Sequence, residues 1–242
     1  LLSLSTIKNN RLIALISVLA VVMSLSACAE NSANNPKTSK LDLGGDVELI
    51  GAGASFPSPL YQTWFTELNK KYANLKVNYQ SVGSGASVEQ FTKGTVDFGA
   101  SDVAMKDEEI KKIPADQGVL LLPVTAGSIV LAYHLPDAPN IPGDVATLKL
   151  PRAVYVDILL GKIKFWDDPA IAQANPSTKL PKEEIKVIYR ADGSGTTDVF
   201  TKHLSTISPE WKTKVGNGKS VKWPVGVGAK GNEGVTAQVQ QT

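Results

Sequence analysis

Three short turns rich in glycine, serine and threonine are the part of the sequence best suited to chemistry. They span residues 51–56, 83–87 and 192–197, and each follows a predicted strand and precedes a predicted helix. Small residues let the backbone approach a ligand, the first N–H groups of a helix have no partner within it, and hydroxyl groups add further donors. One such turn could be an ordinary helix cap. Three of them, with Arg190 beside the last, predict an oxyanion-binding site.

Other motifs that could bind a nucleotide or a metal are incomplete. The first turn lacks the third glycine of a dinucleotide fingerprint, because Phe56 stands in its place. Residues 218–220 match the end of a Walker A loop, but Thr213 stands where that loop needs a glycine. His134 and His203 lie far apart and the chain has a single cysteine, so we expect no metal, no cofactor and no histidine-based catalysis.

The turns need strands and helices to hold them, and the sequence alternates the two. Apolar runs predict strands at 46–50, 77–80, 96–100, 128–133 and 185–189. Helical spacing predicts helices at about 60–72, 106–113, 153–160 and 197–207, and a short helix with Val88 and Phe91 that ends near Gly94. This alternation predicts an α/β fold with mainly parallel sheets and helices on both sides. The ligand would then bind at the C-terminal ends of the strands.

The composition suits a globular protein and argues against a polyanionic partner. With 43% hydrophobic and 20% charged residues in a chain of 242, the protein can bury a core. The formal net charge of +2 derives from Lys8 and Arg11 near the N-terminus, and without them the formal charge is zero. We therefore expect no nucleic-acid partner.

The N-terminal segment has the pattern of a targeting signal. Basic residues precede an apolar run at 12–23, which is shorter than a membrane span. The run closes on Leu-Ser-Ala before Cys28, which resembles a bacterial lipobox. We predict a lipoprotein signal peptide over 1–27, a lipid on Cys28 and a flexible tether over 28–45. A plain signal peptide with an incidental cysteine is the alternative.

Six segments along residues 46–242 stand out, which are GAGASFPSPLY, VNYQSVGSGAS, VDFGASD, LLGKIKFWDDPAI, RADGSGTTDVF and VKWPVGVGAKGN. In sequence and in order they resemble the phosphate-binding proteins of bacterial ABC phosphate transporters. The resemblance implies the type II periplasmic-binding-protein fold, with two α/β lobes, a ligand cleft and a hinge. It places lobe I at 46–124 and lobe II at 125–242, with the hinge near 123–127.

The resemblance also implies that a C-terminal part is missing. In the family the mature chain is longer, and its C-terminal part finishes the second lobe and returns to complete the first. Lobe I would then be incomplete, because it lacks this return segment, and lobe II would lack its last elements. We predict that the isolated 242-residue product is unstable or binds phosphate poorly.

The family's ligand residues match this sequence position by position. The resemblance implies phosphate contacts from eight residues, which are Ser55, the backbone N–H of Phe56, Ser84, Asp102, Arg190, Ser194, Gly195 and Thr196. Asp192 matches the carboxylate that holds the arginine, although Arg190 and Asp192 could also be a structural ion pair. Ser55 stands where the family has threonine, which keeps a hydroxyl group at that position.

Asp102 is the informative member of this set. An ionised carboxylate only accepts hydrogen bonds, so it repels an anion that brings no proton. Phosphate near neutral pH still carries a proton, whereas sulfate does not, and Asp102 should therefore discriminate against sulfate. Outside the family context, Asp102 could simply be a helix N-cap.

The sequence thus predicts a binding protein rather than an enzyme. The expected function is capture of inorganic phosphate outside the cytoplasm, in the periplasm or at the cell surface, by a lipid-anchored monomer. It would deliver phosphate to ABC permease transmembrane subunits, which work with a cytoplasmic ATPase. The alternatives are a secreted phosphatase-like enzyme on the same fold, a receptor for another oxyanion, and a role in signalling or adhesion.

Overall fold

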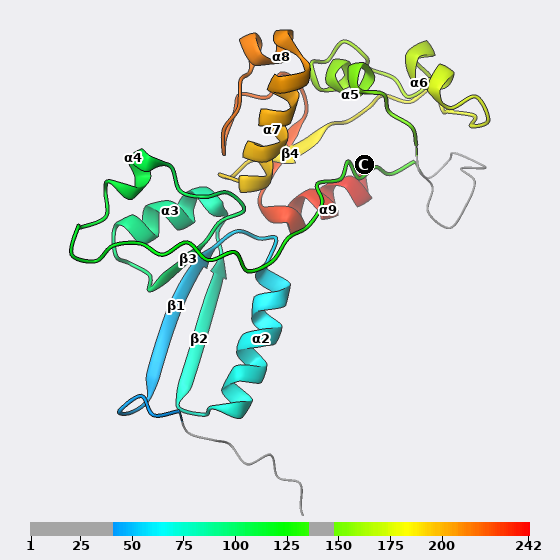
Figure 1. The fold of residues 1–242 in the computed structure, drawn as a ribbon. Coiled ribbons are helices and arrows are strands. Elements are labelled where there is room, and N and C mark those ends of the chain that lie inside the picture. The colour runs from blue at the N-terminus through cyan, green and yellow to red at the C-terminus, as the bar shows by residue number, and fades with distance from the viewer. Residues whose placement is uncertain (1–40, 136–147) are drawn as a thin grey trace, which may run out of the picture. The chain divides into compact units, whose positions relative to one another are not determined.

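The computed structural model describes residues 41–135 and 148–242, which are coloured in Figure 1. Lys40–Thr242 belong to one compact unit. The predicted signal peptide 1–27, Cys28 and most of the predicted tether 28–45 lie outside the described residues. Within the two described ranges, no helix is both long enough and apolar enough to cross a membrane.

A three-stranded parallel sheet forms the first lobe. Its strands are β1 (Val47–Gly53), β2 (Leu75–Ser81) and β3 (Phe98–Ala100), in the order β2-β1-β3. Parallel neighbours require crossover connections, and α2 (Ser58–Lys71) and α3 (Ser84–Thr92) lie in these connections. In Figure 1, α2 runs beside β2, and α3 packs near β3.

An aromatic cluster packs α2 onto this sheet. The ring of Tyr61 on α2 meets the ring of Tyr79 on β2 edge to face, with centroids 5.1 Å apart. Phe65 contacts Phe98 of β3 in the same manner at 6.0 Å. Gly51 on β1 leaves room for the Phe98 ring, because a Cβ there would overlap it. Such aromatic pairs bury a large apolar area in a defined geometry.

The second lobe contains the short parallel pair β4 (Ile188–Arg190) and β5 (Val227–Ala229). Its helices are α5 (Arg152–Leu159), α6 (Pro169–Ala174), α7 (Gly195–Ile207), α8 (Pro209–Lys214) and α9 (Gly231–Gln241). Trp211 of α8 and Leu204 of α7 are fully buried and pack against Val156 and Leu159 of α5. This core fixes the start of α7, which carries part of the candidate site.

The register of both sheets brings strand ends together. In the first sheet, Gly53 pairs with Ser81 and with Ala100, so β1, β2 and β3 end at one edge. In the second sheet, Arg190 pairs with Ala229, so β4 and β5 also end together. The turns that follow the strands therefore meet at the C-terminal edge of each sheet, as the sequence predicts for an α/β protein.

Several predicted elements differ from the structure, and the strands expected at 96–100 and 185–189 are shorter, as β3 and β4 have three residues each. The expected strand at 128–133 is wrong, because residues 119–135 have no helix or strand and no described strand pairs with them. Without a partner, several apolar side chains of this stretch remain exposed, including Leu120 at 77% and Val130 at 75%. The helix expected at 106–113 is shorter, as α4 covers only Asp107–Ile110.

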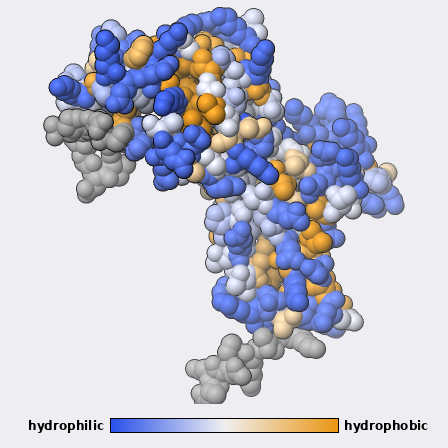
Figure 2. Space-filling view, turned by 180° about the vertical axis from the view of Figure 1, so that it is seen from behind, coloured by the Kyte–Doolittle hydropathy of each residue, from blue (hydrophilic) through white to orange (hydrophobic). Residues whose placement is uncertain are grey.

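Figure 2 shows apolar surface, in orange, among the hydrophilic residues of one face.

Candidate functional site

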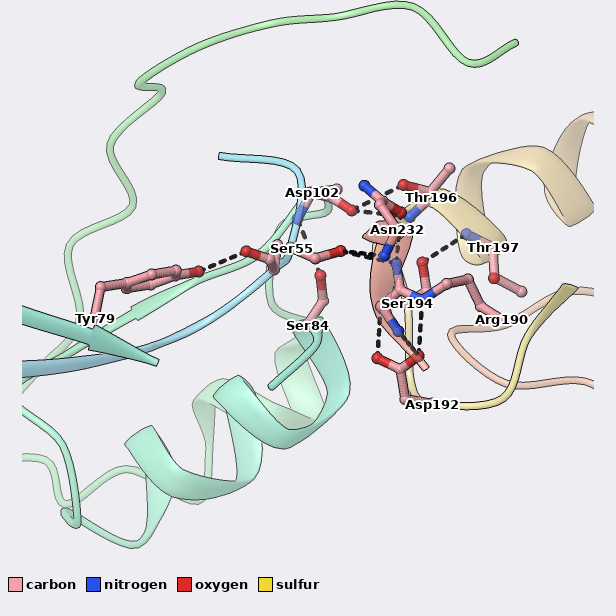
Figure 3. Close-up of polar contacts among 12 residues, drawn as sticks. Ser55, Tyr79, Ser84, Asp102, Arg190, Asp192, Ser194, Thr196, Thr197 and Asn232 are labelled. Atoms are coloured by element: carbon pink, nitrogen blue, oxygen red, sulfur yellow. Dashed lines mark hydrogen bonds and ion pairs between the residues drawn. The ribbon is translucent and has the colours of Figure 1, made fainter. Parts of the chain in front are cut away.

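The three predicted glycine-rich turns converge in the structure (Figure 3). The Gly85 N–H, in the second turn, donates to the Gly193 carbonyl, in the third, over 2.8 Å. Glycine on both sides favours this approach, because a Cβ on Gly85 would lie 3.0 Å from the Cα of Gly193, a tight contact that would push the two turns slightly apart. Ser55, in the first turn, reaches the third turn through Arg190. Residues separated by more than a hundred positions thus surround one spot.

Arg190 is the positive charge at the centre of this cluster. Its Nε and Nη2 donate to the two carboxylate oxygens of Asp192 at 2.7 and 2.5 Å, in the planar fork that suits a guanidinium. The side chain of Arg190 is only 7% exposed and that of Asp192 only 16%. The predicted arginine–aspartate pair is therefore present, and it fixes the plane of the guanidinium.

The contacts of Asp192 favour the ionised form of its carboxylate. Burial alone would raise the pKa of Asp192, but hydrogen bonds from Arg190 and from the Gly231 N–H outweigh it. The pKa therefore lies below its ordinary value.

Ser55 connects the two lobes. Its buried hydroxyl oxygen accepts from Arg190 Nη1 and from the Asn232 backbone N–H, each over 3.1 Å. Behind it, the Tyr79 hydroxyl donates to the Ala54 carbonyl over 2.7 Å. Burial raises the pKa of Tyr79, with smaller contributions from the charges of Tyr61 and Asp102, so the hydroxyl remains a donor. These contacts hold the first turn against β2 and against the second lobe.

Asp102 follows β3 and points at the start of α7. Its Oδ2 accepts from the Thr196 N–H at 3.0 Å and from the Thr196 hydroxyl at 3.1 Å. The Asp102 N–H in turn faces the Ser84 hydroxyl at 3.3 Å. Position 195 requires glycine, because a Cβ on residue 195 would lie 2.6 Å from the Asp102 Cβ. Asp102 therefore does not cap the helix that follows it, which begins at Asp107, but lies at the N-terminus of α7 from the other lobe.

Several N–H groups remain free to bind a ligand. Among the described residues, the backbone N–H groups of Phe56, Ser84 and Gly195 have no hydrogen-bond partner. Ser84 and Gly195 are the first residues of α3 and α7, where such donors are expected and where the helix dipole favours an anion. Ser194, the N-cap of α7, accepts from the Thr197 N–H over 3.2 Å, which leaves its hydroxyl hydrogen available.

These donors, the guanidinium and the carboxylate form the candidate site. All eight residues predicted to contact phosphate lie in the turns that converge here or at the adjoining strand ends. The family model for the PBP superfamily domain matches residues 31–242.

The chain belongs to the PBP superfamily.

Relatives of this PBP-superfamily chain include the phosphate-binding protein PstS of Pasteurella multocida, which is 49% identical over 80% of this chain and 53% of the relative. PstS of Haemophilus influenzae is 48% identical over 80% of this chain and 55% of its own length. PstS of Methanocaldococcus jannaschii is 40% identical over 91% of this chain and 57% of its own length. The chain thus spans about half the length of the curated relatives it matches.

A solved structure has the same fold as this PBP-superfamily chain. It is a phosphate ABC transporter substrate-binding protein with bound phosphate from Clostridium perfringens, with a TM-score of 0.60 and 19% sequence identity. The match covers 81% of this chain and 67% of the other. Together with the family match, it confirms the predicted α/β fold of the type II periplasmic binding proteins. The exact lobe boundaries and the hinge near 123–127 stay predictions.

One contributor to the site of this PBP-superfamily chain was not predicted. Asn232, the second residue of α9, accepts from Arg190 Nη1 with its Oδ1 over 2.9 Å. A signal was present, because Gly231 and Asn232 begin a helix directly after a strand, and a glycine likewise precedes α3 and begins α7. The sequence did not reveal the strand, because glycines at 226 and 228 interrupt its apolar run.

A second unpredicted contact joins the lobes beside the site. Lys219 Nζ lies 2.9 Å from Glu109 Oε1, and both side chains are mostly buried, at 13% and 22% exposure. Burial alone would raise the pKa of Glu109, but hydrogen bonds from the Lys106 N–H and from Lys219 outweigh it and lower the pKa. The backbone of Lys219 also accepts from the Ser194 N–H over 2.8 Å, which links this ion pair to the start of α7.

No metal-binding cluster of three or more His, Cys, Asp or Glu residues occurs in the part of the chain that the structure describes. The site of this PBP-superfamily chain instead offers hydrogen-bond donors, one guanidinium and one acceptor. Such a set can bind an oxyanion and can distinguish a protonated one from one without a proton.

Proposed function

We propose that this chain binds inorganic phosphate at the site formed by the converging turns. One observation carries the proposal. The converging turns and strand ends carry three backbone N–H groups without partners, a buried guanidinium and the carboxylate of Asp102. Figure 3 shows Ser55, Ser84, Asp102 and Arg190 together. Donors dominate, as an oxyanion requires, and the single acceptor suits a ligand that brings a proton.

Each group has a distinct role in this proposal. The N–H groups of Phe56, Ser84 and Gly195 donate to phosphate oxygens. Hydroxyl hydrogens of Ser55 and Ser194 add to them, because their oxygens already accept from other donors. Four of the five N–H bonds of Arg190 are used by Asp192, Ser55 and Asn232, so the arginine supplies charge and its remaining Nη2 hydrogen.

Asp102 provides the selectivity in this proposal. Its Oδ2 is engaged by Thr196, whereas its Oδ1 has no partner among the described residues. The Oδ1 can therefore accept the hydrogen of a protonated phosphate. Sulfate at neutral pH brings no hydrogen, and its oxygen would face a carboxylate oxygen instead.

Isothermal titration of the purified protein with phosphate, arsenate and sulfate tests this function. We expect one phosphate per folded chain, with the weak affinity predicted above for the isolated 242-residue product. We also expect competition by arsenate, which has the same shape and protonation, and little competition by sulfate. Sulfate binding as tight as phosphate binding would overturn the role of Asp102. A protein that binds none of the three would overturn the proposed function itself.

The wider role is also a proposal. Relatives called phosphate-binding protein PstS, and a structural neighbour described as an ABC transporter substrate-binding protein, support delivery of phosphate to an ABC permease from outside the cytoplasm, without chemistry on the ligand. Transport assays in cells whose own binding protein is deleted would test this role. Turnover of a chromogenic phosphate ester by the purified protein would instead indicate an enzyme.

The proposed lipid anchor needs a separate test. It depends on Cys28 in a lipobox-like context, and it would hold a monomer at a bacterial membrane. Mass spectrometry of the mature N-terminus should find a diacylated or triacylated peptide that begins at Cys28. A mature N-terminus elsewhere, or an unmodified cysteine, would contradict the anchor.

A further inference from the structure

Asn232 makes two contacts with residues of the proposed phosphate site, although it is not among the proposed ligands. Its backbone N–H donates to the Ser55 hydroxyl oxygen over 3.1 Å, and its side-chain Oδ1 accepts from Arg190 Nη1 over 2.9 Å. The preceding residue, Gly231, donates its N–H to Asp192 Oδ1 over 3.1 Å. The start of α9 thus contacts the arginine, its carboxylate partner and the serine together (Figure 3).

The position of β5 explains why α9 begins here. Arg190 and Ala229 are paired at the ends of β4 and β5, so the turns after these strands leave the sheet side by side. The first N–H groups of any helix lack partners within the helix. In α9, the N–H groups of Gly231 and Asn232 donate to Asp192 and Ser55, so two hydrogen bonds hold the start of the helix at the site.

The chemistry of the contact fixes the orientation of the Asn232 amide. A guanidinium can only donate, so the atom that faces Arg190 must be the amide oxygen. This oxygen is a neutral acceptor. It restrains Nη1 without adding a negative charge to a guanidinium that already pairs with Asp192.

The contacts at Ser55 also fix the direction of its hydroxyl hydrogen. A serine oxygen has two lone pairs and one hydrogen. Both lone pairs are occupied, by Arg190 Nη1 and by the Asn232 N–H. The hydrogen must therefore point away from both donors, which leaves it to donate to an anion.

We propose that Asn232 is a positioning residue of the anion site, which holds the Arg190 guanidinium through its side chain and orients the Ser55 hydroxyl through its backbone. This inference rests on the proposed phosphate-binding function. It predicts that the neutral oxygen at position 232 matters for affinity and not for folding. An aspartate there keeps the acceptor but adds a charge that opposes phosphate.

Two substitutions separate positioning from stability. Asn232→Ala removes the acceptor and should weaken phosphate binding about tenfold, because a hydrogen bond to a charged group is lost. Asn232→Asp should weaken it more, about a hundredfold, by the added repulsion. Both variants should melt within a few degrees of the wild type. Asn232→Ala loses one hydrogen bond, which contributes about 1–2 kcal/mol, and in Asn232→Asp an acidic residue in the first turn of a helix is favourable. Gln240→Ala, on an exposed position of the same helix, serves as the control and should leave affinity unchanged.

Titration with inorganic phosphate and thermal melting of the purified full chain give the main result. Asn232→Asp affinity within threefold of wild type, or a loss of affinity that follows a loss of melting temperature, would overturn the inference. A double-mutant cycle adds a sharper test. In an Arg190→Lys background, where Nη1 no longer exists, Asn232→Ala should have less than a threefold effect. A full tenfold effect there would show that Asn232 does not act through the guanidinium.

A measurement without ligand separates this inference from the proposed function. In ¹⁵N NMR of the wild type, the two Nη groups of Arg190 should give resolved signals, because hydrogen bonds restrict guanidinium rotation. In Asn232→Ala the Nη1 signals should broaden or merge, and unchanged signals would contradict positioning. If the wild type binds no phosphate, the proposed function fails, while the NMR result still decides whether Asn232 holds Arg190.

Discussion

Replacement of Asp102 by asparagine tests the proposal that this carboxylate makes the site bind phosphate in preference to sulfate. The Oδ2 of Asp102 accepts from both the N–H and the hydroxyl of Thr196, at 3.0 and 3.1 Å. An asparagine can place its single oxygen at the same point and keep these contacts. The change is then confined to the other terminal atom, where an NH₂ donor replaces the charged acceptor Oδ1.

The size of the effect follows from this one exchange. Phosphate loses a hydrogen bond to a charged acceptor, which contributes about 2 kcal/mol. Sulfate is relieved of an unpaired carboxylate oxygen against its own oxygen, a penalty of about 2 kcal/mol as well. Each change corresponds to about 30-fold in affinity. The ratio of sulfate to phosphate dissociation constants in Asp102→Asn should therefore fall about a thousandfold.

Competition titration at fixed ionic strength and neutral pH measures this ratio. Phosphate is titrated into each protein with and without a large excess of sulfate. Asp116→Asn, which changes an exposed aspartate in a turn after α4, is the matched control and should keep the wild-type ratio. If Asp102→Asn keeps the selectivity of the wild type within about threefold, the proposed role of Asp102 is wrong.

Three further substitutions test the supports of the site. Asp192→Asn should weaken phosphate binding, and the loss of unfolding free energy that it causes should depend on pH. Because the pKa of Asp192 is lowered in the folded protein, its ionised carboxylate stabilises the fold at pH values above its unfolded pKa of about 3.9. This contribution is lost as the pH falls through the lower pKa of the folded state. Urea unfolding at pH 7 should therefore show a larger difference from wild type than unfolding near pH 2, and equal differences would refute the assignment. Gly195→Ala should abolish tight phosphate binding while α7 stays folded by circular dichroism, because its Cβ would overlap that of Asp102; unchanged affinity would show that the approach is not required. Trp211→Ala should cost about 3–5 kcal/mol of unfolding free energy, because it empties a fully buried position, and a loss below 1 kcal/mol in urea melts would contradict the described core.

Much of the first lobe could be predicted from local sequence. The apolar strand before residue 51, the helix at about 60–72 and the glycine-rich turn between them are signals within a few residues of one another, and the structure has β1 and α2 at nearly these positions. The run at 128–133 has the same apolar character but forms no strand. Strand formation needs a partner to satisfy the backbone, and local composition does not say whether one is present.

The candidate site was predictable only where local sequence carries a signal. The glycine-rich turns indicate hydrogen-bond donors, and the family resemblance supplied the identities of Asp102 and Arg190. The contacts of Asp102 with Thr196, across 94 positions of the chain, follow from the packing of two lobes and have no local signal. Asn232 was missed because glycines at 226 and 228 interrupt the run that forms β5, so no apolar pattern marks the strand before it.

The central claim is that phosphate binds where the glycine-rich turns converge, and a crystal structure of the protein with inorganic phosphate tests it most directly. The account predicts phosphate oxygens within about 2.7–3.1 Å of the N–H groups of Phe56, Ser84 and Gly195. It also predicts a short contact between the protonated phosphate oxygen and Asp102 Oδ1, with the Arg190–Asp192 pair intact. Phosphate bound elsewhere, or bound here with Asp102 turned away from it, would contradict the account.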